Sequence, residues 1–211
     1  MKIPIALKLR TRARKELAEA QDMIVKEIFN TYDNAIFHGG TAIWRCYSGN
    51  RFSEDIDVYL PKDAKKLDQV FENLQKQGFK IEKKKVTDNS LFSNLKSNNV
   101  NVRFEAIFKM SSGELKDYEK IDGNFITVRC LEAEELVKEK VNAYLSRLKI
   151  RDLYDIYFLL RFISDKNKVR KELERLLKEF KNPKDEDDLK TLILEGLVPK
   201  TNEMLNYIGK W

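Results

Sequence analysis

Two acidic residues, Asp55 and Asp57, stand two positions apart near the end of the first quarter of the chain. On a β-strand this spacing places both carboxylates on one face, with Ile56 and Val58 on the other. Two carboxylates side by side pack poorly against apolar neighbours and are well suited to bind Mg²⁺. The pattern therefore predicts a magnesium site, and an exposed strand edge is the alternative interpretation.

A glycine pair, Gly39 and Gly40, precedes these acids and follows a short apolar segment that ends at His38. Bare backbone N–H groups at the start of a helix approach a phosphate closely. We expect Thr41 to cap a helix over residues 42–47 and to offer its hydroxyl to a triphosphate. An ordinary strand-to-helix turn is the alternative. Phosphate on one side and metal on the other are the minimum requirement for moving a nucleotidyl group.

Three further residues complete the candidate site around the acids. Two Mg²⁺ ions need about three carboxylates, and Glu105, on the polar face of a predicted strand over residues 100–109, is the expected third. The alternative for Glu105 is an acid on a solvent face. Arg51 and Ser53 flank the acids, and Arg51 would either contact phosphate or pair with Glu54.

A second group of charged residues lies later, in a segment predicted to be helical. Lys140, Arg147 and Arg151 are spaced seven and four apart, which keeps them within about 40° of arc on one continuous helix. Lys140 borders the apolar stripe of that helix, so it is predicted to reach the nucleotide phosphates from the edge of a cleft. A lysine extending from a core margin into water is the alternative.

The next predicted helix, residues 151–163, is apolar apart from its start, so its charges need partners. We expect Arg151 to pair with Asp155 four residues on. Asp152 would then remain a free carboxylate near the reaction, orienting the acceptor or taking its proton. Compensation of the helix dipole is the alternative role for Asp152.

The elements that must position these residues change in character along the chain. An α+β segment, residues 1–130, is expected to precede a helical region, residues 131–211. The periodicity predicts strands over residues 35–38, 55–60, 79–87, 90–96, 100–109 and 125–128. It predicts helices over residues 10–31, 42–47, 63–77, 132–149, 151–163, 167–181, 185–195 and 201–208.

The composition is that of a charged globular protein, with 42% hydrophobic and 35% charged residues and a net charge of +6. The first 15 residues alone carry six cations and no acid. This basic segment would attract a nucleic acid, or it is simply a solvated helix start. Cys46 and Cys130 show no metal-type spacing and are expected to be free thiols in a reducing compartment. No apolar run approaches a membrane span, so a cytoplasmic location is expected.

Two motifs together resemble a known family. The sequence Gly-Gly-Thr, a short helix and then Arg-Phe-Ser-Glu-Asp-Ile-Asp (residues 39–57) resembles the first motif of DNA polymerase β-type nucleotidyltransferases. More narrowly it is similar to the AbiEii/MenT branch, the toxin halves of toxin–antitoxin and abortive-infection pairs. A later helical motif of that branch matches Glu139-Lys140, Ala143, Arg147 and Arg151 through Asp155. The resemblance covers residues 34–160.

The resemblance implies a polymerase β-type core, a mixed sheet with helices, followed by a helical region. It implies an enzyme that uses Mg²⁺, with Mn²⁺ as an alternative, to transfer NMP from an NTP to an acceptor hydroxyl, releasing pyrophosphate. The implied nucleotide-binding residues are Gly39, Gly40, Thr41, Arg51, Ser53, Lys140 and Arg151. The implied acceptor is the end of a tRNA, and the implied protein partner is a cognate antitoxin.

Two rival functions remain open from the sequence. The same site could act on a hydroxyl of a protein or of a small molecule such as an aminoglycoside. Alternatively, the chain could be a nucleotide-binding module without turnover. The intact Gly-Gly-Thr and Asp-Ile-Asp segments argue against that second alternative.

Overall fold

The computed structural model describes residues 3–211, and the chain divides into two compact units. The first unit comprises Met1–Ser48 and Ser53–Leu131, and the second comprises Gly49–Phe52 and Glu132–Trp211. The assignment of residues 49–52 to the helical unit was not predicted from the sequence. Within residues 3–211, every helix is too short or too polar to cross a bilayer.

The first unit is built on a mixed sheet with the strand order β3-β4-β5-β2-β1-β7-β6. Strands β2 and β5 and strands β1 and β7 are parallel, and the other neighbours are antiparallel. The predicted α+β fold with a mixed sheet is confirmed. The strands span Ile36–His38 (β1), Ile56–Leu60 (β2), Lys80–Val86 (β3), Ser90–Ser97 (β4), Val100–Phe108 (β5), Glu114–Glu119 (β6) and Phe125–Cys130 (β7).

Strand β6 was not predicted from the sequence. Its segment alternates in charge and contains only two apolar side chains, Leu115 and Tyr118, of which Leu115 is exposed. The segment forms a strand because β7 pairs with it along its whole length. Pairing of this kind depends on a partner distant in space and is invisible to local periodicity.

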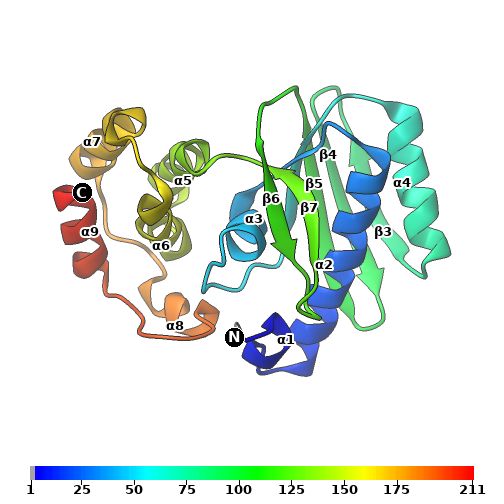
Figure 1. Ribbon diagram of the computed structural model, residues 1–211, viewed down its shortest axis with the longest axis horizontal. Helices are drawn as coiled ribbons and strands as arrows, with labels where there is room; N and C mark the ends of the chain where they lie inside the picture. The colour runs from blue at the N-terminus through cyan, green and yellow to red at the C-terminus, as the bar shows by residue number, and fades with distance from the viewer. Residues whose placement is uncertain (1–2) are drawn as a thin grey trace. The chain divides into compact units, whose positions relative to one another are not determined.

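Helices cover the apolar side of the sheet. Figure 1 shows α3 (Gly39–Cys46) to the left of β6 and β7, with α2 (Arg12–Thr31) and α4 (Ala64–Lys76) to their right. Along β5, Val102, Phe104 and Ala106 are buried, and the ring of Phe104 lies 6.1 Å from that of Phe71 on α4. The alternate residues of β5 face the other way and stay accessible. A short helix, α1 (Ile5–Lys8), precedes α2.

The second unit is helical in the described residues, with short 3₁₀ turns between helices. Its α-helices span Ala133–Arg147 (α5), Ile150–Leu159 (α6), Arg170–Glu179 (α7), Leu189–Leu192 (α8) and Thr201–Lys210 (α9). Helix α5 ends because Leu148 adopts a left-handed conformation with φ 54°. The break falls near the boundary predicted between the helices over residues 132–149 and 151–163, so Arg151 lies on α6 and does not share one helix with Lys140 and Arg147.

The segment Gly49–Phe52 joins the second unit through backbone hydrogen bonds. The N–H of Phe52 donates to the carbonyl of Leu192 at 2.9 Å, and the N–H of Leu194 donates to the carbonyl of Asn50 at 2.8 Å. Arg51 and Ile193 form the bridge between these bonds. Two residues separate this segment from Asp55, so the chain that carries the predicted acids passes directly from the second unit to the first.

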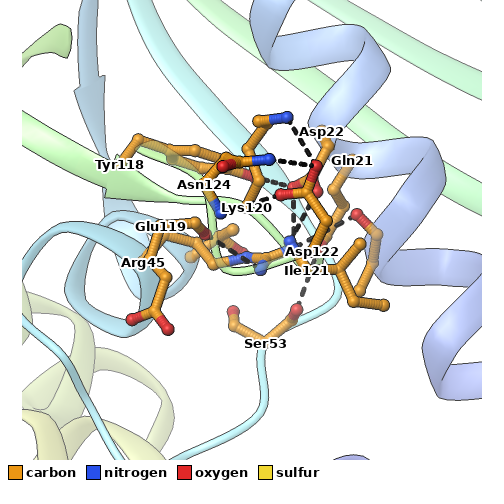
Figure 2. A network of polar contacts seen from close by, with 12 residues as sticks. Gln21, Asp22, Arg45, Ser53, Tyr118, Glu119, Lys120, Ile121, Asp122 and Asn124 are labelled. Carbon is orange, nitrogen blue, oxygen red and sulfur yellow. Dashed lines mark hydrogen bonds and ion pairs between the residues drawn. The ribbon is translucent and has the colours of Figure 1, made fainter. Parts of the chain in front are cut away.

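A buried polar network links α2, α3 and β6 inside the first unit (Figure 2). The carboxylate of Asp22 accepts hydrogen bonds from Arg45 at 2.9 Å, from the Tyr118 hydroxyl at 2.8 Å and from the N–H of Ile121 at 2.8 Å. Burial raises the pKa of Asp22, and the Arg45 guanidinium opposes that rise. Arg45 also donates to the carbonyls of Ala18 and Glu119. The three elements are thus fixed by polar bonds rather than by packing alone.

We expect Arg45→Met to lower the free energy of unfolding by about 3–5 kcal/mol, because it leaves the Asp22 carboxylate buried without its cation. Urea unfolding measures the loss. The matched control is Arg12→Met, since the Arg12 side chain is 90% exposed in its pair with Glu16. A surface pair of this kind contributes little. Equal, small losses for the two variants would contradict the structural role of Arg45.

Candidate active site

The carboxylate of Asp57 lies directly against the backbone of Gly39. A Cβ atom placed on Gly39 would overlap the Asp57 Oδ2, so a side chain at this position would have to displace that carboxylate. Gly39 also has φ +74°, a conformation that favours glycine. The antiparallel pairing of β1 and β2 produces this contact, since His38 lies opposite Asp57. Glycine is therefore required at position 39 for two independent reasons.

Helix α3 begins at Gly39, and no side chain caps its N-terminus. The predicted cap by Thr41 is wrong, because Thr41 lies inside the first turn and is fully buried. Its hydroxyl donates to the backbone carbonyl of Asp55. The first N–H groups of an uncapped helix lack partners within the helix and favour an anion. The start of α3 thus has the character expected of a phosphate-binding turn, and Thr41 fixes the acidic loop beneath it.

Gln21 of α2 forms hydrogen bonds with the loop that leads into Asp55. This residue was not predicted from the sequence. The Gln21 Nε2 donates to the carbonyl of Ser53 at 3.0 Å and to that of Glu54 at 2.9 Å (Figure 2). Together with the bond from Thr41, three successive carbonyls of this loop have buried donors. The signal was available, because Gln21 stands on the apolar stripe of α2, where a polar residue needs a partner.

Three carboxylates lie near one another on and beside the inner strands β2 and β5. Glu105 lies directly opposite Asp57 on the parallel strand β5, and Asp55 immediately precedes β2. The pKa of Glu105 is raised by its burial and by the nearby charges of Asp57 and Asp55, while Arg103 opposes the rise. The Arg103 guanidinium pairs with Asp55 and, at 3.0 Å, with Glu105. The acids are thus close enough to repel, and a cation already lies between two of them.

Carboxylate oxygens are the ligands that Mg²⁺ prefers, and three acids with an excess of negative charge fit that ion chemically. Among residues 3–211, no group of three acidic, histidine or cysteine side chains has the closed arrangement of a metal site. Arg103 occupies part of the space between Asp55 and Glu105. Metal binding by Asp55, Asp57 and Glu105 therefore stays a prediction, and it requires Arg103 to move.

The charged residues of the second unit form a buried ion cluster of their own. Asp155 accepts two hydrogen bonds of 2.8 Å from Arg51 and lies 2.8 Å from the Nζ of Lys140. Asp152 accepts two hydrogen bonds of 2.7 Å from Arg147 and lies 3.6 Å from Lys140. Lys140 is only 6% exposed, and both aspartates are almost fully buried. Two carboxylates thus share three cations between α5, α6 and the segment around Arg51.

These contacts correct three expectations from the sequence. Asp155 pairs with Arg51 and Lys140 instead of Arg151, and Arg51 pairs with Asp155 instead of Glu54. Asp152 is not a free carboxylate, because Arg147 and Lys140 neutralise it. The physical reason is the same each time: a charge removed from water needs a buried partner of opposite sign, whereas Glu54 is exposed.

The predicted roles of several residues in catalysis or nucleotide binding are not tested by these contacts. Thr41 and Arg51 have their polar groups engaged within the protein, and the Ser53 carbonyl accepts from Gln21. Lys140 and Asp152 are held in the ion cluster. Nucleotide contacts of Arg51, Ser53, Lys140 and Arg151, and a catalytic role for Asp152, stay predictions.

Comparison with known proteins identifies the family. A family model described as nucleotidyl transferase AbiEii toxin, type IV toxin–antitoxin system, matches residues 28–204. The chain belongs to the AbiEii family. It is therefore a nucleotidyltransferase of the type IV toxin–antitoxin class, and the resemblance noted from its two motifs is confirmed.

Solved structures share the fold of this AbiEii protein at low sequence identity. MenT4, a nucleotidyltransferase toxin from Mycobacterium tuberculosis, matches with a TM-score of 0.66 and 20% identity, over 99% of this chain and 88% of that one. JHP933 from Helicobacter pylori matches with a TM-score of 0.65 and 21% identity, over 95% and 90% of the two chains. No curated protein sequence matches.

We expect Gly39→Ala to lower nucleotidyl transfer by on the order of 100-fold, because the new methyl group displaces the Asp57 carboxylate. The matched control is Gly78→Ala, since Gly78 has φ +95° with no atom within 4 Å of a Cβ. Both variants carry backbone strain of about 1–2 kcal/mol, measurable by urea unfolding. Only Gly39→Ala should lose activity at a temperature where both remain folded. Equal activity of the two variants would contradict the role assigned to the Gly39–Asp57 contact.

We expect Asp155→Asn to lower the free energy of unfolding by about 3 kcal/mol or more, because two buried cations lose their shared carboxylate. Burial opposes the charged form of Asp155, but Arg51 and Lys140 outweigh burial and lower its pKa. The stabilisation is therefore complete above the unfolded-state pKa of about 3.9 and is lost as the pH falls through the lowered folded-state pKa.

Urea unfolding between pH 3 and pH 8 tests this dependence. The difference between wild type and Asp155→Asn should be constant above about pH 5 and shrink only in acid. Asp187→Asn is the matched control, since Asp187 forms an exposed pair with Lys190. A difference that grows as the pH falls would contradict the sign assigned to Asp155.

Proposed function

We propose that this AbiEii protein transfers NMP from an NTP to an acceptor hydroxyl with the help of Mg²⁺ or Mn²⁺. We further propose that the acceptor is the end of a tRNA and that a cognate antitoxin protein restrains the enzyme. The type IV toxin–antitoxin class supports the antitoxin, and the family motifs support the acceptor.

One observation carries the chemical part of the proposal, namely the contact between Asp57 and Gly39. It joins an acid suited to metal binding to the uncapped N-terminus of α3, which is suited to bind phosphate. A nucleotide has its metal-bound oxygens on the same phosphates that such a helix end would hold. An acid in contact with an uncapped helix N-terminus suits this chemistry, and this contact supports the proposal.

The residues that would hold the metal are Asp55, Asp57 and Glu105. A divalent ion held by these residues would supply the positive charge that neutralises the charge developing on the nucleotide phosphates. The Arg103 guanidinium, now paired with Asp55 and Glu105, supplies the compensating positive charge to these acids. We expect it to be displaced when the divalent ion binds.

Positive charge supports a nucleic acid as acceptor. The chain has a net charge of +6. Of the cations in the basic first segment, Arg10, Arg12 and Lys15 are exposed on or before α2, while Lys2 lies outside the described residues. Exposed cations raise the rate and strength of encounter with RNA phosphates.

The test is transfer of label from each α-labelled NTP to total RNA, resolved on a denaturing gel. We expect label in the tRNA band with wild type, and a loss of roughly 100-fold or more with Asp57→Asn or with EDTA. Asp117→Asn is the matched control, since Asp117 is an exposed acid of the same unit. Label in protein instead of RNA would overturn the tRNA acceptor. Absence of label in every fraction would overturn the proposed reaction for this chain.

A further inference from the structure

The accessible face of the sheet carries a row of side chains that leads away from the carboxylates. Asp57 on β2 lies opposite Glu105 on β5. Glu105 lies opposite Phe92 on β4, and Phe92 lies opposite Lys85 on the edge strand β3. Cross-strand partners point to the same face of a sheet. The row therefore places an aromatic ring and then a lysine on the same face as the proposed metal-binding acids.

A second row runs beside the first. Arg103 on β5 lies opposite Asn94 on β4, and Asn94 lies opposite Lys83 on β3. One step further, Asn101 lies opposite Lys96, which lies opposite Lys80. Adjacent strands are about 4.8 Å apart, so the backbone of β3, which carries these lysines, lies about 10 Å from the backbone of β5, which carries Glu105. The positive charge of β3 thus lies a short distance from the candidate reaction site, within reach of a short segment of single-stranded nucleic acid.

Three of the four lysines named on this face are exposed and have no carboxylate partner in the described part of the chain, whereas Lys96 lies 3.8 Å from the carboxylate of Glu82. Lys80, Lys83 and Lys85 are exposed, and within residues 3–211 no carboxylate pairs with any of them. Their neighbour Lys84 is different, because it bonds to Asp68 at 2.8 Å and lies over the Phe71 ring of α4. The pairing of Lys84 is local and structural, whereas the three other lysines have charge available for a ligand.

Phe92 gives this face a shape as well as a charge. Its ring is half-buried, and the Nζ of Lys83 lies 5.0 Å from the ring centroid. A hollow of about 320 Å³ surrounds it, lined by Lys83, Lys85, Thr87, Ser90 and Phe92. The hollow offers an apolar ring and two ammonium groups, which are groups that contact the base and phosphate of a nucleotide. The hydroxyls of Thr87 and Ser90 are hydrogen-bonded to each other at 2.9 Å.

We propose that Lys83, Lys85 and Phe92, here called the β3–β4 strip, bind the single-stranded 3′ end of the RNA acceptor. A base stacks on Phe92, and the lysines contact the phosphates on the 5′ side of the reacting 3′-terminal nucleotide. The inference rests on the proposed function, since it assumes that the acceptor hydroxyl reaches the acids of β2 and β5. Cations interleaved with an aromatic ring are typical of surfaces that bind single-stranded RNA.

Protection of a sheet edge is the competing explanation for the lysines. Lysines on an edge strand prevent pairing with other chains, and β3 is an edge strand. That explanation covers Lys83 and Lys85 but leaves Phe92 without a reason, because Phe92 lies on the inner strand β4. An accessible ring in direct cross-strand register with Glu105 is explained by a ligand.

The test measures binding of two fluorescein-labelled RNA hairpins, one with a four-nucleotide single-stranded 3′ tail and one with a blunt end. The variants are Lys83→Gln with Lys85→Gln, and separately Phe92→Leu. The matched controls are Lys65→Gln with Lys76→Gln, two exposed lysines of α4, and Phe125→Leu, an exposed phenylalanine of β7. Transfer of α-labelled NTP to the tailed hairpin is measured in parallel, so that loss of activity and loss of binding are separate readouts.

We expect the double lysine variant to weaken binding of the tailed hairpin by roughly tenfold and to lower the salt slope by about 1–2. Phe92→Leu should weaken the tailed hairpin by about 5-fold to 100-fold and leave the blunt hairpin unchanged. The controls should match wild type. Circular dichroism and urea unfolding verify that Phe92→Leu is folded, and the lysine variants test the strip independently of that residue.

Three outcomes would overturn the strip. If wild type transfers label and every variant binds the hairpins with unchanged affinity, the RNA-binding role of the β3–β4 strip is contradicted and the proposed function stands. An equal loss of affinity in the α4 lysine control would show that the effect comes from overall charge and not from the β3–β4 strip. Competition by polyglutamate that depends on Lys83 and Lys85, with no dependence on the RNA tail, would assign the surface to an acidic protein. Tail-dependent binding without any transfer would instead support the strip and overturn the proposed reaction.

Discussion

The first unit depends on one close contact, the approach of the Asp57 carboxylate to the backbone of Gly39. No side chain fits between them, and the backbone at Gly39 has a conformation that other residues adopt at a cost. The surrounding structure holds both partners in place. The hydroxyl of Thr41 and the amide of Gln21 fix the loop before β2, and β1 fixes the turn before α3. These bonds fix the backbone of the loop before β2 and of the turn before α3 without a ligand, which lowers the cost of ordering that backbone during catalysis.

The second unit uses charge differently. Its motif of Lys140, Arg147, Asp152 and Asp155 forms a buried cluster with Arg51, so the same residues that resemble a functional motif hold α5 and α6 together. A buried cluster of this kind is a weak source of net stability, because desolvation offsets much of the attraction. The cluster instead specifies one arrangement of α5 and α6, since removal of any member leaves a buried charge without a partner. Residues required by the fold and residues required by chemistry thus cannot be separated by sequence motif alone.

Much of the fold was accessible from the sequence because its signals are local. The alternation of Val102, Phe104 and Ala106 with polar residues identified β5 and the face on which Glu105 lies. The glycines before α3 and the spacing of Asp55 and Asp57 identified the turn and the acids. Apart from the start of α3, which lies earlier than the predicted cap at Thr41, the errors depended on partners distant in sequence. Strand β6 exists because β7 pairs with it, and Arg51 is neutralised by a residue 104 positions away.

The position of Arg103 shows that a pattern of acids alone does not describe the electrostatics of a site, because the chain can supply its own neutralising cation. Three carboxylates on neighbouring strands repel, and the raised pKa of Glu105 records part of that repulsion. A guanidinium two residues from Glu105 relieves it without any bound ion. A divalent cation must therefore compete with the guanidinium that the chain itself supplies. Its affinity depends on how much more strongly the acids interact with the ion than with Arg103. Arg103 lies on β5 two residues from Glu105, in the row of cross-strand partners that leads through Asn94 to Lys83 on β3.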